Sequence, residues 1–171
     1  DTTDKAAWRA LLQPALDGHD IGLISEAGLP AVADPGAALV AAAHELGVPV
    51  RPLAGASSLL LALAASGLDG QSFAFVGYVP QEPDRRLARI RELESLSRRL
   101  RQTQLLIETP YRNAALLGAL VSGLAESTRL SVSCGLTLAQ EFTRTDTVAQ
   151  WRKRGQQFPD RCPAVFGLLA E

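Results

Sequence analysis

Strand-like and helix-like segments alternate along almost the whole chain of 171 residues, and this alternation limits the folds open to it. Short apolar runs such as 21–25 and 48–53 predict strands. Longer segments such as 84–101, with apolar residues roughly three or four positions apart, predict helices. Regular alternation of the two is typical of an α/β fold, which we therefore expect here.

Turn residues and capping residues set the expected limits of these elements. We expect helices over 4–16, 34–46, 58–67, 84–101, 111–124 and 147–154, and strands over 21–25, 48–53, 73–76, 104–108, 129–136 and 163–170. Asp34 before Pro35, and Thr109 before Pro110, are typical of helix starts. Glycine and prolines after residue 76 suggest a junction, so the expected lobes are 1–72 and 73–171.

The composition is that of a globular domain without a membrane span. Apolar residues make up 47% of the chain, charged residues 20%, and the formal net charge is -1. The longest apolar stretch, 59–65, is far too short to cross a bilayer, and no leader pattern argues for secretion. Cys134 and Cys162, like His19 and His44, lack metal-ligand spacing. We expect reduced buried thiols, no metal site and a cytoplasmic location.

The strand–loop–helix turns of the first half indicate where a ligand would bind. Open α/β sheets bind ligands at the carboxyl ends of their strands, and Gly28 and Gly55 would let the backbone approach one closely. Asp34 and Ser57 stand at expected helix starts and have polar side chains. Glycines and capping residues also belong in ordinary tight turns, so spacing alone leaves both interpretations open.

An ordered series of motifs is more specific than these turns. The motifs are ISEAGLPAVADPG at 24–36, LAGASS at 53–58, SGL at 66–68, FAFVGYVP at 73–80 and IETPYR at 107–112. This series resembles the tetrapyrrole methylase superfamily, and within it the bacterial ribosomal RNA small subunit methyltransferase I group. The resemblance extends over nearly the whole chain.

The resemblance implies a two-lobed class III methyltransferase fold that holds S-adenosylmethionine in a cleft between its lobes, usually in a homodimer. Members of the family also have a first strand and a glycine-rich turn before a helix like the one expected at 4–16. The chain has no such segment and no methionine, so we expect an incomplete N-terminal lobe. By position, the donor-binding residues implied are Gly28, Leu29, Pro30, Val32, Ala56, Ser57, Ser58, Ile107, Leu136 and Ala164.

Methyl transfer from an activated sulfonium mainly requires alignment of donor and acceptor, so few catalytic side chains are needed. A hydroxyl acceptor would still need a proton acceptor, and Glu108 is the candidate carboxylate. The alternative is that Glu108 forms an ion pair with Arg112, four residues further along the chain.

The acceptor expected from the resemblance is ribosomal RNA, at a ribose 2'-hydroxyl. Residues 85–101 contain seven arginines and two glutamates, an excess of five positive charges that suits phosphate, a tetrapyrrole carboxylate or simply a solvated helix face. Gly135, Leu138 and 161–163 depart from the family pattern, as does Leu29. The alternatives are therefore a methyltransferase acting on a tetrapyrrole or another small molecule, and an inactive donor-binding relative. A dinucleotide-binding domain is disfavoured because no G-x-G-x-x-G run is present.

Overall fold

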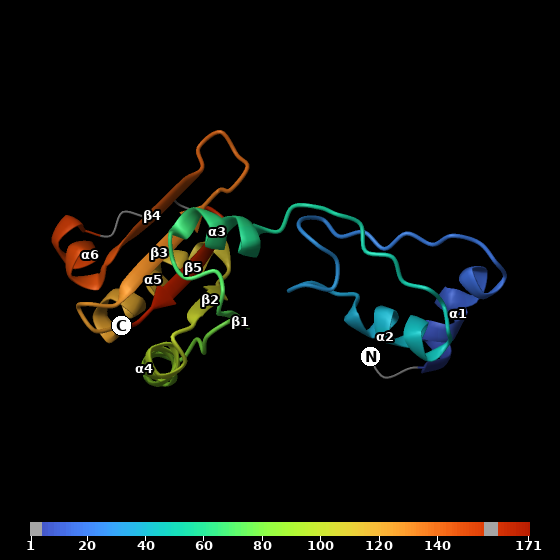
Figure 1. Cartoon of the computed structure of the whole chain (residues 1–171), viewed down its shortest axis with the longest axis horizontal. Helices are drawn as coiled ribbons and strands as arrows, with labels where there is room; N and C mark the ends of the chain where they lie inside the picture. Colours follow the sequence, from blue (N-terminus) through green and yellow to red (C-terminus); the bar gives the residue numbers. More distant parts are fainter. Residues whose placement is uncertain (1–4, 156–160) are drawn as a thin grey trace. The chain divides into compact units, whose positions relative to one another are not determined.

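The structure, a computed structural model, describes residues 5–155 and 161–171. The chain divides after Ser57 into two compact units (Figure 1). This division comes earlier than the boundary expected after residue 72. The helix α3 (Ser58–Ser66), which we expected in the first lobe, belongs to the second unit because it packs on that unit's strands.

The first unit contains two helices, α1 (Lys5–Leu16) and α2 (Ala37–Glu45), which contact each other. Leu12 of α1 and Ala43 of α2 are buried, and an ion pair of 3.1 Å joins Lys5 Nζ to Glu45 Oε2. Both helices were predicted from the sequence, although Asp4, where the first was expected to begin, lies outside the described residues.

The strands expected at 21–25 and 48–53 are wrong, because neither segment is a strand in the structure. Within the described part of this unit, no backbone hydrogen bond joins the two segments. Their apolar side chains also lack a covering layer, with Ile24 88% and Leu53 84% exposed. An extended segment becomes a strand only when its backbone groups pair with a neighbour, and here they do not.

The start of α2 also differs from the prediction, because Gly36 and not Asp34 is the N-cap residue. The φ angle of Gly36 is 132°, which favours glycine. The preceding turn is closed by a hydrogen bond of 3.2 Å from Val32 N to Leu29 O, and by one of 3.3 Å from Ala31 N to Pro35 O. Because of this tight turn, the helix begins only at Ala37.

The second unit is built around a five-stranded mixed sheet. Its elements after α3 are β1 (Phe73–Gly77), α4 (Pro83–Leu100), β2 (Thr103–Ile107), the 3-10 helix η1 (Pro110–Arg112), α5 (Asn113–Gly123), β3 (Arg129–Cys134), β4 (Phe142–Thr147), α6 (Val148–Arg154) and β5 (Ala164–Leu169). The strand order is β1-β2-β5-β3-β4. β1 and β2 are parallel, whereas β5 is antiparallel to β2 and β3, and β3 is antiparallel to β4. The α/β class expected from the sequence is confirmed.

Helices cover both faces of this sheet (Figure 1). On one face, α4, α5 and α6 bury a core that contains Ile90, Leu117 and Trp151 against Leu106 and Phe166 of the strands. On the other face, α3 packs through apolar side chains on a smaller cluster formed with β5. Side chains alternate between faces along a strand, so successive side chains of β2 and β5 pack on opposite faces of the sheet.

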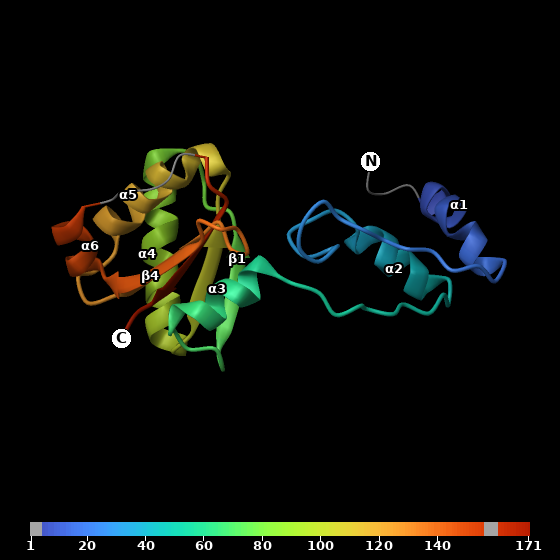
Figure 2. The ribbon, with the colours of Figure 1, turned by 90° about the horizontal axis from the view of Figure 1, so that it is seen from above.

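β4, which was not predicted from the sequence, pairs with β3 over its full length, from Phe142 opposite Cys134 to Thr147 opposite Arg129. The segment reads FTRTDT, in which three β-branched threonines alternate with other residues, a pattern that favours a strand. Figures 1 and 2 show β4 leading directly into α6.

Cys134 and Cys162 form a disulfide, so the expectation of two reduced thiols is wrong in this structure. The physical reason is the pairing of β3 with β5, which sets Cys134 opposite Ala164 and places the segment just before β5 beside the end of β3. The two Cα atoms are 6.2 Å apart. A separation of 28 residues in the sequence gave no indication of this proximity.

Among the described residues, no helix combines the length and the apolar character needed to cross a membrane.

Candidate functional site

The loops that follow β1 and β2 lie at one edge of the sheet, because these neighbouring strands are parallel. Phe73 pairs with Thr103 at their starts, and Gly77 pairs with Leu106 near their ends after a bulge. Tyr78 follows β1, while Glu108 follows β2 and leads into η1. This is the edge at which α/β sheets bind ligands.

Glu108 anchors the turn after β2. Its side chain is only 1% exposed, and its Oε1 atom accepts hydrogen bonds from Arg112 Nη2 at 2.8 Å and from the Thr109 backbone N–H at 2.7 Å. The Thr109 hydroxyl donates to the same oxygen at 3.3 Å. Thr109 therefore does not cap the following helix with its side chain, and the expected helix 111–124 is divided into η1 and α5.

The electrostatics of Glu108 favour the ionised form. Burial raises the pKa of this carboxyl group, but the hydrogen bonds from Arg112 and Thr109 outweigh burial and lower the pKa below its usual value of 4.5. A carboxylate with a lowered pKa is a weak proton acceptor near neutral pH. The geometry is thus the ion pair with Arg112 that we expected as the alternative to catalysis.

Two of the predicted donor-binding residues of the second unit come together beside the start of α3. Ile107 and Leu136, both half-buried, pack against the cluster of Leu59, Ala62 and Val165. Ser58 is exposed at the first position of α3.

Ala164 differs from them, because its side chain is buried in the core on the opposite face of the sheet. Only its backbone, paired with Cys134, lies along the same strand end as Val165. The structure therefore packs Ile107 and Leu136 against the same cluster but places the Ala164 side chain on the other face of the sheet.

The predicted residues of the first unit belong to two segments that lie against each other. A Cβ atom added at Gly55 would lie 3.5 Å from Leu29 Cδ2, so the loop 28–30 contacts the segment that precedes Ala56. Gly28 has a φ of 75°. The remaining members of this set are half-buried Pro30, exposed Val32 and Ala56, and buried Ser57.

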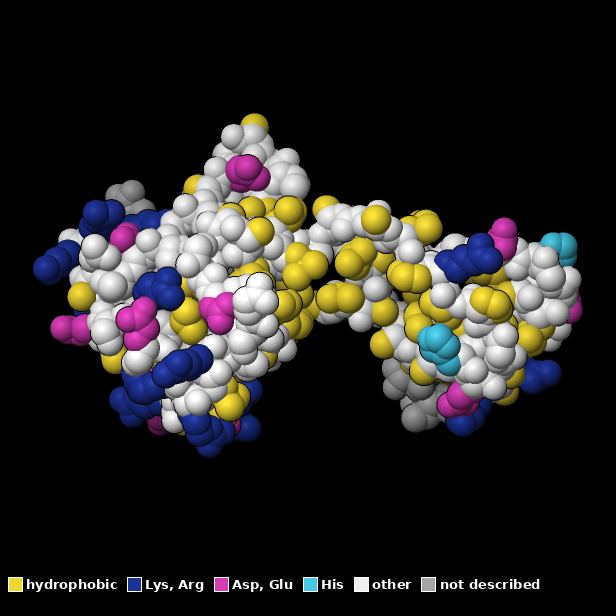
Figure 3. All heavy atoms as spheres, viewed as in Figure 1, with side chains coloured by type: hydrophobic (Ala, Val, Ile, Leu, Met, Phe, Trp, Pro, Cys, Tyr) yellow, Lys and Arg dark blue, Asp and Glu magenta, His cyan; other side chains and the backbone are white. Residues whose placement is uncertain are grey.

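Arginine side chains gather over α4 in the second unit (Figure 3). Some of these arginines have partners: Arg89 pairs with Glu92 at 2.7 Å, and Arg86 donates to the carbonyl oxygens of Pro80 and Gln81. Four others are exposed and form no ion pair within the described residues. These are Arg85, Arg91, Arg99 and Arg101.

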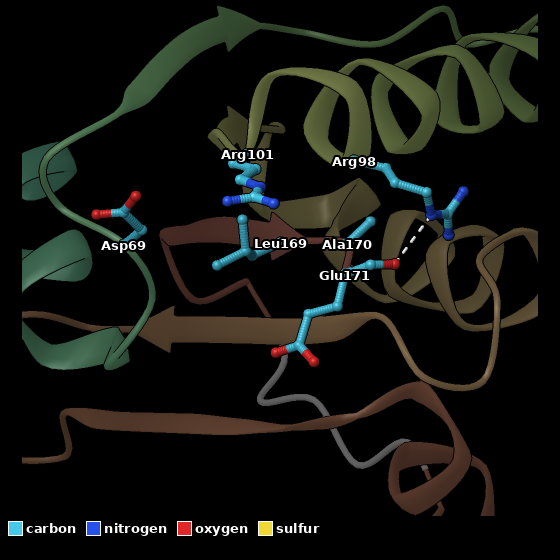
Figure 4. A pocket seen from close by; sticks show the side chains of 6 residues that line it. All are labelled: Asp69, Arg98, Arg101, Leu169, Ala170 and Glu171. Carbon is cyan, nitrogen blue, oxygen red and sulfur yellow. Dashed lines mark hydrogen bonds between the residues drawn. The ribbon is translucent and has the colours of Figure 1, made fainter.

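A pocket of about 470 Å³ lies elsewhere in the second unit, at the C-terminal end of α4 (Figure 4). It is lined by Asp69, Arg98, Arg101, Leu169, Ala170 and Glu171. None of the predicted site residues lines it. Leu169 ends β5, whereas Val165, opposite Ile107, stands near its start, so the pocket and the loop after β2 lie at opposite ends of that strand.

Asn113 contributes to the turn after β2, although it is not among the site residues predicted from the sequence. It is fully buried at the start of α5, and its Nδ2 donates to Cys162 O at 2.7 Å. This bond fixes η1 and α5 against the segment before β5. No sequence signal could have identified the partner, which lies 49 residues away.

In the described ranges, no group of three or more His, Cys, Asp or Glu residues is arranged to hold a metal ion.

The chain matches the family model of the tetrapyrrole (corrin/porphyrin) methylases over residues 2–151. Two curated relatives share the name ribosomal RNA small subunit methyltransferase I. The protein from Mesorhizobium japonicum is 38% identical over 131 residues, which cover 77% of the chain and 43% of that relative. The protein from Micromonospora olivasterospora is 39% identical over 126 residues, which cover 74% of the chain and 39% of that relative. The matched part thus spans less than half of either relative.

Two solved structures have the same fold. The methyltransferase CobJ has a TM-score of 0.62 and 16% identity, with 99% of this chain and 77% of that chain covered. The uroporphyrin-III C-methyl transferase from Thermus thermophilus, complexed with S-adenyl homocysteine, has a TM-score of 0.54 and 22% identity, with 97% and 73% covered.

Proposed function

Because the chain belongs to the tetrapyrrole (corrin/porphyrin) methylases, we propose that the full-length protein transfers a methyl group from S-adenosylmethionine to ribosomal RNA. The observation that carries this proposal is the 38% identity to a ribosomal RNA small subunit methyltransferase I over 131 residues. We extend it to the atom expected from the sequence, a ribose 2'-hydroxyl, and to action as a cytoplasmic homodimer.

The residues present are compatible with the donor. Half-buried Ile107 and Leu136 supply an apolar surface of the kind that adenine needs, and the loop 28–30 brings backbone close to Gly55. The complex of a structural relative with S-adenyl homocysteine supports this choice of donor. The donor, when bound, supplies the activated methyl group, and the protein must orient the acceptor and exclude water.

The positive face of α4 supports RNA as the acceptor. Four exposed arginines, which form no ion pair with any described residue, can neutralise backbone phosphates, which is the main source of affinity for RNA. Glu108 then acts as a positioning residue, since its ion pair holds Arg112 and the turn after β2.

The family description and the uroporphyrin methyltransferase fold favour a second candidate, in which the acceptor is a tetrapyrrole. Carboxylates of such a molecule would also suit the arginines of α4. The two candidates differ in the acceptor that receives label from the same donor.

The test uses full-length protein, radiolabelled S-adenosylmethionine and small ribosomal subunits from a strain that lacks the gene. We expect label in the RNA and none in uroporphyrinogen. After digestion of the RNA to nucleosides, the label should be on a ribose. Label in the tetrapyrrole alone would establish the second candidate. Binding of S-adenosylhomocysteine without turnover on either acceptor would indicate an inactive relative.

The donor site is tested separately by calorimetric titration of S-adenosylhomocysteine. Leu136→Arg is expected to abolish binding, because it places a charge among the apolar side chains around Ile107. Leu138→Arg, at an exposed position in the same loop, is the matched control and should bind normally. Equal binding by both variants would contradict this placement of the donor.

A further inference from the structure

The only two tyrosines of the chain are both exposed at the same edge of the sheet. Tyr78, 58% exposed, follows β1, and Tyr111, 70% exposed, is in η1 after β2. β1 and β2 are parallel neighbours, so the two rings stand after the carboxyl ends of adjacent strands. Within the described residues, neither hydroxyl group forms a hydrogen bond. The fold therefore does not use the polar ends of these side chains.

A fixed guanidinium group lies beside the Tyr111 ring. The Cζ atom of Arg112 lies over the Tyr111 ring, 5.0 Å from its centroid, and the ion pair with Glu108 holds the side chain in place. The hydrogen bond to Glu108 raises the pKa of Arg112 most, burial opposes it, and the nearby Tyr111 and Tyr78 raise it slightly further. Arg112 therefore stays charged beside the Tyr111 ring.

The basic helix α4 begins beside the same loop. Arg86 of α4 donates to the carbonyl oxygens of Pro80 and Gln81, which follow Tyr78 closely in the chain. These bonds tie the loop after β1 to the first turn of α4. The two tyrosines therefore lie near the N-terminal end of α4, where Arg85 is exposed, whereas Arg99 and Arg101 are at the other end of the helix.

We propose that Tyr78, Tyr111 and Arg112 form a stacking platform for unpaired bases of the RNA acceptor, a role that rests on the proposed function. Single-stranded RNA is recognised by aromatic rings and arginine planes on which exposed bases stack, next to cations that contact the phosphates. The platform supplies two rings and one guanidinium plane. Exposed Arg85, in the first turn of α4, supplies a cation beside it.

The experiment measures RNA binding by full-length protein with Tyr78→Leu, Tyr111→Leu and the corresponding Phe variants. The ligands are a 20-nucleotide uridine strand containing one 2-aminopurine and an RNA duplex of equal length. Stacking contributes ~1–3 kcal/mol per base, so each Leu variant should weaken single-strand binding about 5- to 150-fold. The Phe variants should bind almost as tightly as wild type because they keep the ring.

Three further readouts separate stacking from a general loss of structure. Duplex binding and its salt dependence should be unchanged in the Leu variants, because those depend on phosphate contacts. The fluorescence of 2-aminopurine should be quenched by wild-type protein and not by the Leu variants. Phe73→Leu, an exposed aromatic at the other end of β1, is the matched control and should have no effect.

Each outcome supports or overturns the platform. If wild type methylates RNA and the Leu variants bind the single strand equally well, the platform is wrong and the proposed function stands. If the Leu variants alter only the oligomeric mass, these rings contact a second copy of the chain and the platform is again wrong. If wild type neither binds nor methylates RNA but binds S-adenosylhomocysteine, both proposals fail.

Discussion

The buried charge of Glu108, paired with Arg112, determines the conformation of the turn at the edge of the sheet. The carboxylate is almost fully buried, while the arginine side chain remains 23% exposed. Three donors converge on one oxygen of Glu108, so the conformation of residues 108–112 depends on that atom. The turn at this edge therefore has a fixed conformation before any ligand binds.

Replacing this carboxylate should therefore lower stability in a pH-dependent way. Glu108→Gln removes the charge and is expected to reduce the free energy of unfolding by about 2 kcal/mol at pH 7. The pKa of Glu108 is lowered in the folded state, so its contribution is complete above pH 4.5 and is lost as the pH falls further. Urea unfolding followed by tryptophan fluorescence at pH 7 and pH 3 measures both values.

The control is Glu92→Gln, which breaks the exposed pair with Arg89 and should change stability little. A difference between wild type and Glu108→Gln that persisted undiminished at pH 3 would contradict the role assigned to the charge.

Local spacing made the Glu108–Arg112 pair predictable, because residues four apart in a turn can meet. The contacts of Asn113 and the disulfide were not predictable in the same way. Both involve Cys162, whose position depends on how β5 enters the sheet. Contacts between residues distant in sequence follow from strand order, which a single sequence does not specify.

Among the elements, α4 and α5 pack closely because α5 has a glycine at the contact. A Cβ atom at Gly123 would lie 2.6 Å from Leu87 Cδ1 and 3.4 Å from Ile90 Cγ2. The absence of a side chain lets the end of α5 approach α4, and the arginine-rich helix is held on the core by this contact.

A larger side chain at this contact should loosen the pair of helices. Gly123→Leu is expected to destabilise the protein by about 1–3 kcal/mol through overpacking, as measured by thermal or urea unfolding. Gly70→Leu provides the control, because nothing lies within 4 Å of a Cβ atom at that position. Equal stability of the two variants would show that Leu87 simply moves aside.

The start of α6 is determined by a capping box. Thr147 Oγ1 accepts from Gln150 N at 3.3 Å, and Gln150 Oε1 accepts from Thr147 N at 3.1 Å. Thr147→Ala should cost about 1 kcal/mol of stability, whereas Thr147→Ser keeps the hydroxyl group and should cost much less. Chemical unfolding of the two variants measures this difference, and identical losses would argue against the cap.

The sequence predicted elements best where their signal was local. The helix α6 was predicted at 147–154, although its cap at Thr147 was not, and the long helix α4 was predicted within a residue or so of its bounds. The failures were strands: 21–25 and 48–53 have apolar residues but no pairing, whereas β4 has polar threonines and pairs fully with β3. Strand formation depends on a partner. Apolar content alone therefore predicted two strands that do not form and missed one that does.

At the scale of the whole molecule, the buried apolar clusters belong entirely to the second unit. Every residue of both clusters, among those described, lies at or after Leu59. Among the described residues of the first unit, the buried apolar side chains are Leu12 and Ala43. Its two helices therefore have little apolar area with which to offset the entropy of ordering the chain.

This division predicts that the second unit folds alone. A fragment of residues 58–171 should unfold cooperatively in urea, with a midpoint close to that of the whole chain. A fragment of residues 1–57 should show no cooperative transition by circular dichroism. Loss of cooperativity in the 58–171 fragment would mean that the first unit contributes to the core.

The sheet order has a consequence for synthesis on the ribosome. β5 lies in the middle of the sheet, between β2 and β3, but it is the last described strand in the chain. Until β5 emerges, the β1–β2 pair and the β3–β4 hairpin have no common neighbour, and each presents an open edge. Nascent chains are therefore most exposed to aggregation and chaperone capture in the interval between translation of Thr147 and Leu169.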